Sequence, residues 1–350
     1  MATLDKLSGK ATAGAELSRE DVSRAMLALL DDVVGEDAKA DFLTALARRG
    51  ETAGEIAAFA LELRARAVDP KIDPEKFGGV VLDVVGTGAD MANTFNISSC
   101  VMFVVAAAGV AVAKHGNRAI TSKCGSADVL TALGAKIELS PDLARRCLET
   151  TGVTFLFAPH YHPAFKSIAP VRRKLAERKQ RTVFNILGPL VNPARPTHQL
   201  VGVFERALVG KFAEVLRLLE VKHALVVHGD GLDELSTLGV NTMAELWAGR
   251  IEHTERDFRV PHTSWRGVVV KPEELFGGDA TTNAGIVRDV LAGKDRSARR
   301  DIVLLNTAAA LVVAEKVTDF ASGWNVAAEL VDSGAALEKL DRFVEATNRG

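Results

Sequence analysis

The chain has 350 residues, enough for one large domain or two unequal ones with a sizeable hydrophobic core. Its 43 lysine and arginine residues nearly balance 45 aspartate and glutamate residues, and the formal net charge of -2 argues against a protein that binds nucleic acid or another polyanion. The three cysteines, an odd number without metal-ligand spacing, argue against a disulfide framework and are typical of free thiols in a reducing compartment.

The start of the chain lacks the apolar core of a signal peptide. The most apolar stretch, residues 101–113, is too short to cross about 30 Å of hydrocarbon. We therefore expect a soluble, cytoplasmic protein with no membrane partner and no nucleic-acid partner.

Residues 1–67 show the spacing of amphipathic helices. The capping-box pattern Ser18-Arg19-Glu20-Asp21 precedes a helix with Val22, Met26 and Leu29 on one face. Two further helices are predicted over residues 38–48 and 52–68, and a Pro- and Gly-containing linker follows at 69–79. The apolar faces of this helical unit need a partner to bury them.

From Val80 onward, short β-branched runs alternate with helical ones, which predicts a mainly parallel sheet with crossover helices. Residues 282–284 are predicted to precede a helix, residues 237–272 to be rich in β-structure, and residues 300–315 and 326–343 to cover the sheet. The predicted strands are 80–85, 110–113, 135–139, 153–157, 200–204 and 224–227, and the predicted helices between them begin near 99, 126, 141, 164 and 208. Ligands of such sheets bind at the carboxyl ends of the strands.

The strand ending at Val85 is followed by Gly86-Thr87-Gly88-Ala89-Asp90 and then by a hydroxyl-rich helix start at 94–99. Free N–H groups and the positive end of a helix dipole favour an anionic ligand in that loop. The next strand ends in the cationic segment Lys114-His115-Gly116-Asn117-Arg118. Met91 stands where a dinucleotide fingerprint requires a third glycine, and no Walker pattern follows.

Two more segments carry polar groups at the end of a strand. Asp233 and Glu234 follow the strand at 224–227, and they are either plain surface carboxylates or ligands of Mg²⁺. His160 and His162 have no third ligand nearby, so a pocket or loop role is favoured over a metal site. The basic residues of 164–181 are predicted to be mostly a solvated face.

Five motifs together resemble those of anthranilate phosphoribosyltransferases, the enzymes that join anthranilate to phosphoribosyl pyrophosphate in tryptophan synthesis. In chain order they are DVVGTGAD, TFNISS, AKHGNRAITSKCGSADVLTALG, FNILGPLVNPA and HGDGLDELS. The resemblance covers roughly residue 8 to the end. It implies a small all-helical domain at 1–77, joined by a later insertion at roughly 165–195, and a larger α/β domain at 78–350. It also implies a homodimer formed through the helical domain.

The resemblance further implies a set of binding residues. Phosphoribosyl pyrophosphate would be bound by Gly86, Ala89, Asp90, Thr94, Asn96, Ile97, Ser98, Ser99, Lys114, His115, Gly116, Asn117, Arg118, Ala119, Ile120, Thr121, Ser122 and Ser126. Anthranilate would be bound by Gly86, His115, Asn117, Pro159, His162, Phe165 and Arg172, whose planar fork would pair with the carboxylate. Mg²⁺, the implied cofactor, would be bound by Ser98, Asp233 and Glu234 together with the pyrophosphate.

No covalent nucleophile or other catalytic residue is expected, because positioning and electrostatic stabilisation suffice for displacing pyrophosphate by a weakly basic amine. The chain departs from the family pattern at Ala89, where a second glycine is usual, at Ser99 and Cys124, and in a longer link between Leu175 and Arg181. Two alternatives remain open: a pyrimidine nucleoside phosphorylase, and a non-catalytic relative that binds nucleic acid.

Overall fold

The N-terminal helices begin where the sequence provides caps. Ser18 Oγ accepts a hydrogen bond from Asp21 N at 3.1 Å, and the Asp21 carboxylate accepts one from Ser18 N, so the predicted capping box is confirmed. Thr52 and Glu55 form a second capping box. The computed structural model describes residues 3–88, 90, 92–119, 123–259 and 270–349. These helices are α1 (Thr3–Thr12), α2 (Arg19–Leu30), α3 (Glu36–Arg49) and α4 (Ala53–Ala65).

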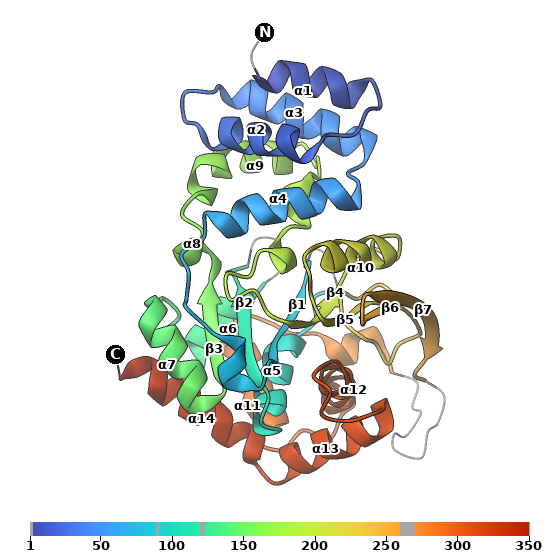
Figure 1. Ribbon diagram of the computed structural model, residues 1–350. Helices are drawn as coiled ribbons and strands as arrows, with labels where there is room; N and C mark the ends of the chain where they lie inside the picture. The colour runs from blue at the N-terminus through green and yellow to red at the C-terminus, as the bar shows by residue number, and fades with distance from the viewer. Residues whose placement is uncertain (1–2, 89, 91, 120–122, 260–269, 350) are drawn as a thin grey trace.

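A later segment of the chain completes the helical unit. Helix α9 (Phe165–Glu177) lies beside α2 and α3 and above the sheet (Figure 1). Its buried residues Ile168, Val171 and Leu175 belong to the same hydrophobic core as Met26 and Leu29 of α2. Burial of these faces stabilises helices that would be marginal in isolation.

The larger unit is built around one seven-stranded sheet, with strand order β3-β2-β1-β4-β5-β6-β7. The first five strands pair in parallel, and β6 and β7 continue the sheet antiparallel. This confirms the expected α/β class with a mainly parallel sheet. The strands are β1 (Val81–Gly86), β2 (Ala111–Gly116), β3 (Val153–Phe157), β4 (His198–Gly202), β5 (His223–Gly229), β6 (Val240–Trp247) and β7 (Arg250–Asp257).

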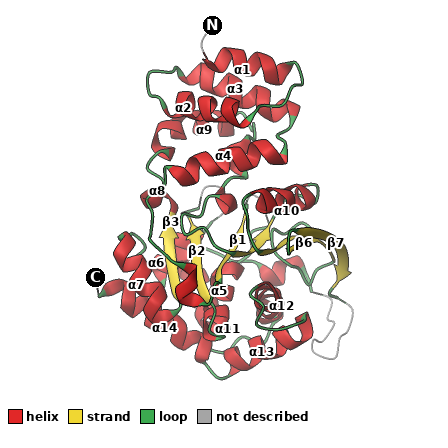
Figure 2. Ribbon diagram, viewed as in Figure 1, coloured by secondary structure: helices red, strands yellow, loops and turns green. Residues whose placement is uncertain are grey.

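Helices cover both faces of the sheet (Figure 2). One face, including Leu82, Val112 and Leu200, packs against the apolar helices α5 and α12. On the other face α10 covers β5 and β6, and α7 covers β2 and β3. The remaining helices and short 3-10 turns of the chain are η1 (Pro74–Phe77), α5 (Ile97–Ala107), α6 (Ser126–Ala132), α7 (Pro141–Thr151), α8 (Ala158–Tyr161), η2 (Val183–Asn185), η3 (Gly188–Leu190), α10 (Leu208–Leu218), η4 (Pro272–Leu275), α11 (Ala280–Leu291), α12 (Ala298–Val313), α13 (Phe320–Asp332) and α14 (Ala335–Asn348).

The strand predicted at residues 135–139 is wrong. Side chains there do alternate between buried and exposed, but the backbone bonds elsewhere: Lys136 N donates to Thr347 Oγ1 at 3.2 Å, and Leu139 O accepts from the Tyr161 hydroxyl at 3.0 Å. The segment is therefore an extended link packed against α14. Helix α11 also begins earlier than predicted, because Asp279 caps it and residues 282–284 lie inside its first turns.

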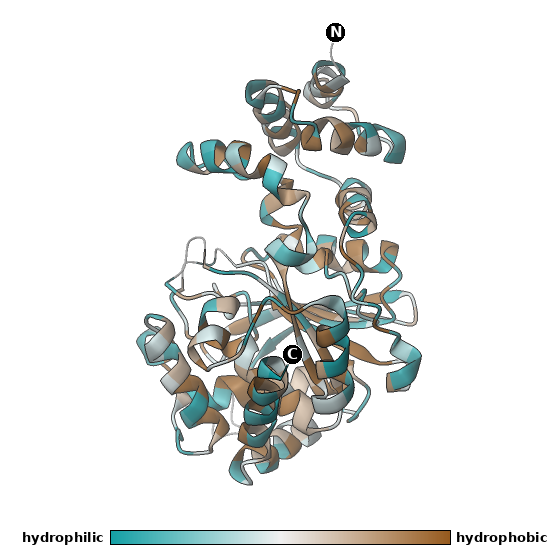
Figure 3. Cartoon of the chain, turned by 90° about the vertical axis from the view of Figure 1, so that its left-hand side faces the viewer, coloured by the Kyte–Doolittle hydropathy of each residue, from teal (hydrophilic) through white to brown (hydrophobic). Residues whose placement is uncertain are grey.

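The helical unit stands over the carboxyl ends of the parallel strands (Figure 1). Val68 N, just after α4, donates to Tyr161 O at 2.8 Å, so the two units touch beside the linker, and Arg64 Nε donates to Leu190 O at 2.7 Å and ties α4 to the later segment. Figure 3 shows hydrophobic residues concentrated on the central strands. None of the described helices is long and apolar enough to cross a membrane.

Candidate active site at the carboxyl edge of the sheet

Two glycines let a distant loop lie across the ends of β1 and β4. Gly86 and Gly202 are direct partners in the sheet. A Cβ at Gly86 would lie 2.3 Å from Asp233 Oδ2, and one at Gly202 would lie 1.5 Å from Asp233 O. Gly88 N donates to Asp233 Oδ2 at 2.6 Å. The absence of side chains at these two positions therefore allows the loop that carries Asp233 and Glu234, the acidic loop, to lie against the glycine loop that follows β1.

The two predicted metal ligands on the acidic loop are crowded by other carboxylates. Burial raises the pKa of Asp233 to about 7, with the negative charge of Asp90 adding to the effect. Burial also raises the pKa of Glu234 to about 8, with Asp233 adding to it. Asp233 N approaches Asp90 Oδ2 at 3.5 Å. The site thus concentrates negative charge that a cation would stabilise.

Ser98 and the acidic loop, which are far apart in sequence, meet in the structure. The Glu234 carboxylate accepts a hydrogen bond from the Ser98 backbone, in the first turn of α5. Lys114 Nζ donates to Ser98 Oγ at 3.1 Å and to Val84 O. Lys114 is buried, and burial lowers its pKa while the nearby carboxylates Asp83 and Glu234 oppose that shift.

The start of α5 supplies the predicted hydroxyl and amide groups. Asn96 occupies the N-cap position without capping the helix through its side chain. Instead, Asn96 Nδ2 donates to Cys124 O at 3.2 Å, and Asn96 Oδ1 accepts from Asn283 Nδ2 at 2.9 Å. Thr94 and Ile97 flank it, and Ser99 is entirely buried. The N-terminal N–H groups of α5 are thus left without a side-chain cap from Asn96.

The segment after β2 is shaped by a residue that the sequence analysis did not select. The Asp128 carboxylate, in the first turn of α6, accepts from Ala119 N at 2.8 Å and from Gly125 N at 3.0 Å, and it pairs with Arg118 Nη1 at 2.9 Å. No capping-box pattern identifies Asp128, because Gly125 at the N-cap has no side chain to complete one.

The remaining residues predicted in this segment also cluster at the end of β2. Asn117 O accepts from Ser126 Oγ at 3.4 Å, and a Cβ at Gly116 would lie 2.2 Å from Ser126 Oγ. Asn117 itself is exposed. Four predicted phosphoribosyl-pyrophosphate residues lie outside the described residues: Ala89, Ile120, Thr121 and Ser122.

A second cluster, made of aromatic rings, lies between the sheet and α9. Ring centroids are 5.2 Å apart for His115 and His162, 5.4 Å for His162 and Phe165, and 6.0 Å for Phe165 and Phe184. Burial lowers the pKa of His115 to about 3 and that of His162 to about 4. Both imidazoles are therefore neutral at physiological pH. The predicted residue Pro159 is exposed on α8.

Arg172 stands at the end of this cluster. Its guanidinium carbon lies 5.8 Å from the ring centroids of both Phe165 and Phe184. The side chain is half-buried, and burial lowers its pKa. Within the described part of the chain no carboxylate pairs with it. A planar cation beside aromatic rings and without an anionic partner suits an aromatic carboxylate.

Phe184 and Gly188 were missed by sequence reasoning, although both lie in the motif FNILGPLVNPA. Gly188 O lies 3.2 Å from His115 Nδ1, so η3 holds the imidazole. The motif was noticed, but its spacing gave no role to any single residue, because the ring contact and the carbonyl contact arise only when η2 and η3 fold back over β2.

Known families and proteins match nearly the whole chain. Residues 6–67 match the helical bundle domain of the glycosyl transferase family, and residues 78–337 match its a/b domain. The chain is 45% identical to anthranilate phosphoribosyltransferase of Roseiflexus sp. (strain RS-1) over 338 residues, which cover 96% of both chains. It is 46% identical to that of Rubrobacter xylanophilus, with 97% of this chain and 96% of the relative covered. The chain belongs to the anthranilate phosphoribosyltransferase family.

Solved structures of this family share the whole fold. The crystal structure of anthranilate phosphoribosyltransferase from Thermus thermophilus has a TM-score of 0.88 at 38% identity and covers 98% of this chain and 99% of its own. The enzyme from Saccharomyces cerevisiae, in complex with PRPP and Mg, has a TM-score of 0.85 at 26% identity and covers 99% of this chain and 98% of its own. The family membership thus extends over both units of the chain.

Proposed function

We propose that the chain transfers the phosphoribosyl group of phosphoribosyl pyrophosphate to the amine of anthranilate, giving N-(5-phosphoribosyl)anthranilate and pyrophosphate. One observation carries the proposal. Lys114 and His115 are consecutive at the end of β2. Lys114 donates a hydrogen bond to Ser98, beside the acidic loop, whereas His115 lies in the aromatic cluster. Successive side chains of a strand point to opposite sides, so this strand end joins a phosphate-binding side to an acceptor-binding side.

On the donor side, the glycine loop after β1 and the N-terminus of α5 would hold the pyrophosphate and ribose. Backbone N–H groups at a helix start favour anions, and Lys114 adds a fixed positive charge beside them. Asn96 links this helix start to Cys124 of the next loop, so both parts of the cradle are held together. Arg118 is tied to Asp128, and this pair holds the second loop against the start of α6.

The chemistry of the acidic loop fits Mg²⁺. Mg²⁺ takes oxygen ligands, keeps several waters and is usually held by one or two carboxylates plus substrate phosphates. Asp233 and Glu234 supply such oxygens beside Ser98, and their pKa values are raised first by burial and then by the negative charge of the neighbouring carboxylates. Among the described residues no group of three or more His, Cys, Asp or Glu side chains could hold a metal ion, so the proposed ion would also need oxygens of the substrate phosphates. When bound, the ion would neutralise the departing pyrophosphate.

On the acceptor side, Arg172 would pair with the carboxylate of anthranilate, and the rings of His115, His162 and Phe165 would enclose its aromatic ring. The neutral imidazoles allow close contact with an aromatic ring without desolvating a charge. Phe184 joins this wall, because its ring packs against both Phe165 and the Arg172 guanidinium.

The reaction forms a bond from the amine nitrogen to ribose C1 and breaks the bond from C1 to the pyrophosphate oxygen, and the amine then releases a proton. The protein's contribution would be alignment of the two substrates and stabilisation of the charge that develops on pyrophosphate. No side chain needs to attack C1. Lys114 would face the departing oxygens from the donor side.

The donor side lies on one unit of the chain, whereas the acceptor side draws residues from both units. We assign residues 1–77 with 165–195 to the helical domain, because α9 shares its core with α2, and residues 78–164 and 196–350 to the α/β domain. Arg172 lies on the first and the acidic loop on the second. Rotation about the linker at 69–79 would bring Arg172 towards the donor side once both substrates are bound.

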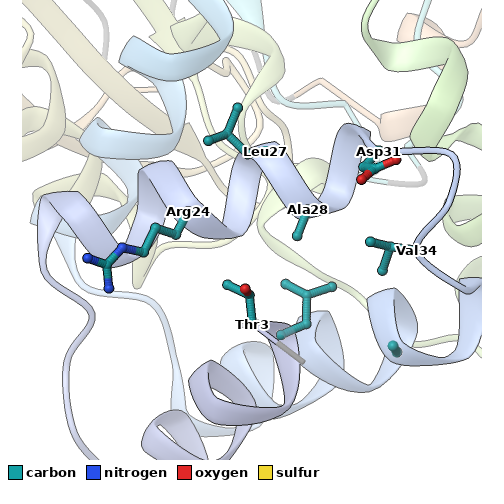
Figure 4. Close-up of a pocket in the computed structure, with 8 residues that line it drawn as sticks. Thr3, Arg24, Leu27, Ala28, Asp31 and Val34 are labelled. Carbon is teal, nitrogen blue, oxygen red and sulfur yellow. The ribbon is translucent and has the colours of Figure 1, made fainter. Parts of the chain in front are cut away.

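A second copy of the chain would cover the outer face of the helical domain. A pocket of about 330 Å³ lies between α1, α2 and α3, and Ala28 and Val34 point into it (Figure 4). Nearby, Leu27 is 59% and Val33 is 91% exposed. Apolar side chains at such a surface favour a homodimer. Light scattering should give twice the chain mass, and Leu27→Asp together with Val33→Asp should give monomers; a monomeric native chain would contradict the dimer.

The cellular compartment follows from the thiols. Cys100 and Cys147 are buried free cysteines. Reduced thiols are typical of the cytoplasm. We therefore place the enzyme there, and a labelled chain that is found in an oxidising compartment would contradict this.

The proposed activity is tested against its enzymatic alternative in one experiment. Purified chain should release pyrophosphate from phosphoribosyl pyrophosphate only when anthranilate is present, and it should not cleave uridine or thymidine in the presence of inorganic phosphate. Phosphorolysis of a nucleoside without transfer to anthranilate would replace the proposed function by the phosphorylase alternative.

A further inference from the structure

The residue after the two acids is held at both backbone polar groups by a single side chain. Asn306 Oδ1 accepts a hydrogen bond from Leu235 N at 2.9 Å, and Asn306 Nδ2 donates to Leu235 O at 2.8 Å. The second proton of the amide is also used, because Nδ2 donates to Ile302 O at 2.9 Å. Asn306 and Leu235 are both entirely buried. A side chain that hydrogen-bonds to both the N–H and the C=O of one residue fixes the position and the orientation of that residue's backbone.

The setting of Asn306 gives no packing reason for an amide. The residue lies in the middle of α12, whose neighbouring residues Leu304, Leu305 and Ala308 are entirely or almost entirely buried in the main core. A buried polar group is costly unless its hydrogen bonds are made, and both donors of this amide are used. An apolar residue would avoid burying an amide, but it would leave the buried N–H and C=O of Leu235 without these partners. The amide therefore has its effect on the loop it holds.

A second buried amide repeats the arrangement one residue further along. Asn241 Oδ1, on β6, accepts from Ser236 N at 2.7 Å, and Asn241 Nδ2 donates to Ser236 O at 2.9 Å and to Gly239 O at 3.0 Å. On the other side of the acids, the backbone of Asp233 rests against Gly202. The backbone on both sides of the two carboxylates is thus held in place, and we call Asn306 and Asn241 the amide clamp.

We propose that Asn306 is a positioning residue that sets Asp233 and Glu234 for the Mg²⁺ complex of phosphoribosyl pyrophosphate, an inference that rests on the proposed function. The acids repel one another, so an unrestrained loop would move them apart when no cation is bound. Hydrogen bonds behind metal ligands hold the ligands in place, and their removal typically costs about 10- to 100-fold in metal affinity or activity. Neither amide needs to touch the ion or the substrate.

The test compares Asn306→Ala with a control on the same helix, Thr307→Val. Thr307 is entirely buried, and its hydroxyl has no hydrogen-bond partner within the described residues. Calorimetry measures phosphoribosyl pyrophosphate binding at increasing Mg²⁺, and steady-state kinetics give the KM of each substrate. In Asn306→Ala the Mg²⁺ concentration for half-maximal binding should rise about 10- to 100-fold. The anthranilate KM should stay within about twofold, and Thr307→Val should match the wild type in both.

Each other outcome decides the inference. A folded Asn306→Ala protein with the wild-type Mg²⁺ requirement, or with equal changes in both KM values, overturns the positioning role and leaves the proposed function standing. A wild-type chain that binds phosphoribosyl pyrophosphate independently of Mg²⁺ overturns the magnesium site and the clamp with it. If Asn306→Ala does not fold, Asn241→Ala decides instead, because it removes the other half of the clamp; an unchanged Mg²⁺ requirement there overturns the inference.

Discussion

Replacing Arg172 by alanine tests whether this side chain binds the carboxylate of the acceptor. The guanidinium has two Phe rings beside it at 5.8 Å and no anionic partner among the described residues, so it is available for a charge-assisted pair. Such hydrogen bonds contribute about 1.5–3 kcal/mol, and each 1.4 kcal/mol is about tenfold. We expect Arg172→Ala to lower kcat/KM for anthranilate by roughly 10- to 100-fold.

The assay follows anthranilate fluorescence, first with anthranilate varied at saturating phosphoribosyl pyrophosphate, and then with phosphoribosyl pyrophosphate varied at saturating anthranilate. The KM for phosphoribosyl pyrophosphate should remain within about twofold, because Lys114 and the acidic loop lie on the other side of β2. Arg172→Lys should lie between wild type and alanine, since it keeps the charge and loses the planar fork. Arg173→Ala is the matched control, because Arg173 is exposed on the same helix.

The reasoning about Arg172 would be refuted by either of two results. Equal losses for both substrates would mean that Arg172 supports the fold and not the acceptor. A similar loss in Arg173→Ala would mean that general positive charge on α9, and not the positioned guanidinium, is responsible.

Three further predictions concern the scaffold. Gly202→Ala should abolish activity, since its methyl group would meet Asp233 O at 1.5 Å, and a fully active variant would contradict the close approach. Burial lowers the pKa of His162 to about 4, so as the pH falls the unfolded chain binds a proton at this imidazole before the folded chain does. The free energy of unfolding should therefore fall as the pH drops below about 6.5. In denaturant titrations His162→Asn should show a shallower fall. Glu55→Ala should cost about 3–5 kcal/mol in urea unfolding, because the buried carboxylate pairs with Arg49 and accepts from Leu17 N; a loss below about 1 kcal/mol would contradict this.

Much of the fold could be predicted from the sequence because local signals and tertiary packing agree. The capping box at Ser18, the apolar run of β1 and the helix after Asn96 lie where their patterns indicate. The strand prediction for residues 135–139 was wrong because alternation of buried and exposed residues indicates how the side chains are buried, not how the backbone pairs. There the partner groups are Thr347 and Tyr161, which no local pattern identifies.

The candidate site could be predicted from the sequence only in part, for a related reason. The glycine loop and Asp233 each stand out as motifs at strand ends. The contacts that join them, such as Gly202 beneath Asp233 and Asn306 behind Leu235, depend on close approaches between segments over 30 residues apart. A single glycine or asparagine in an apolar run carries no sign of its distant partner.

The most direct test of the account follows anthranilate fluorescence in the presence of phosphoribosyl pyrophosphate, with and without Mg²⁺. Loss of the signal is expected only when both substrates and the metal are present, with one pyrophosphate released for each anthranilate consumed. Folded chain that leaves anthranilate unchanged under those conditions would contradict the proposed transfer.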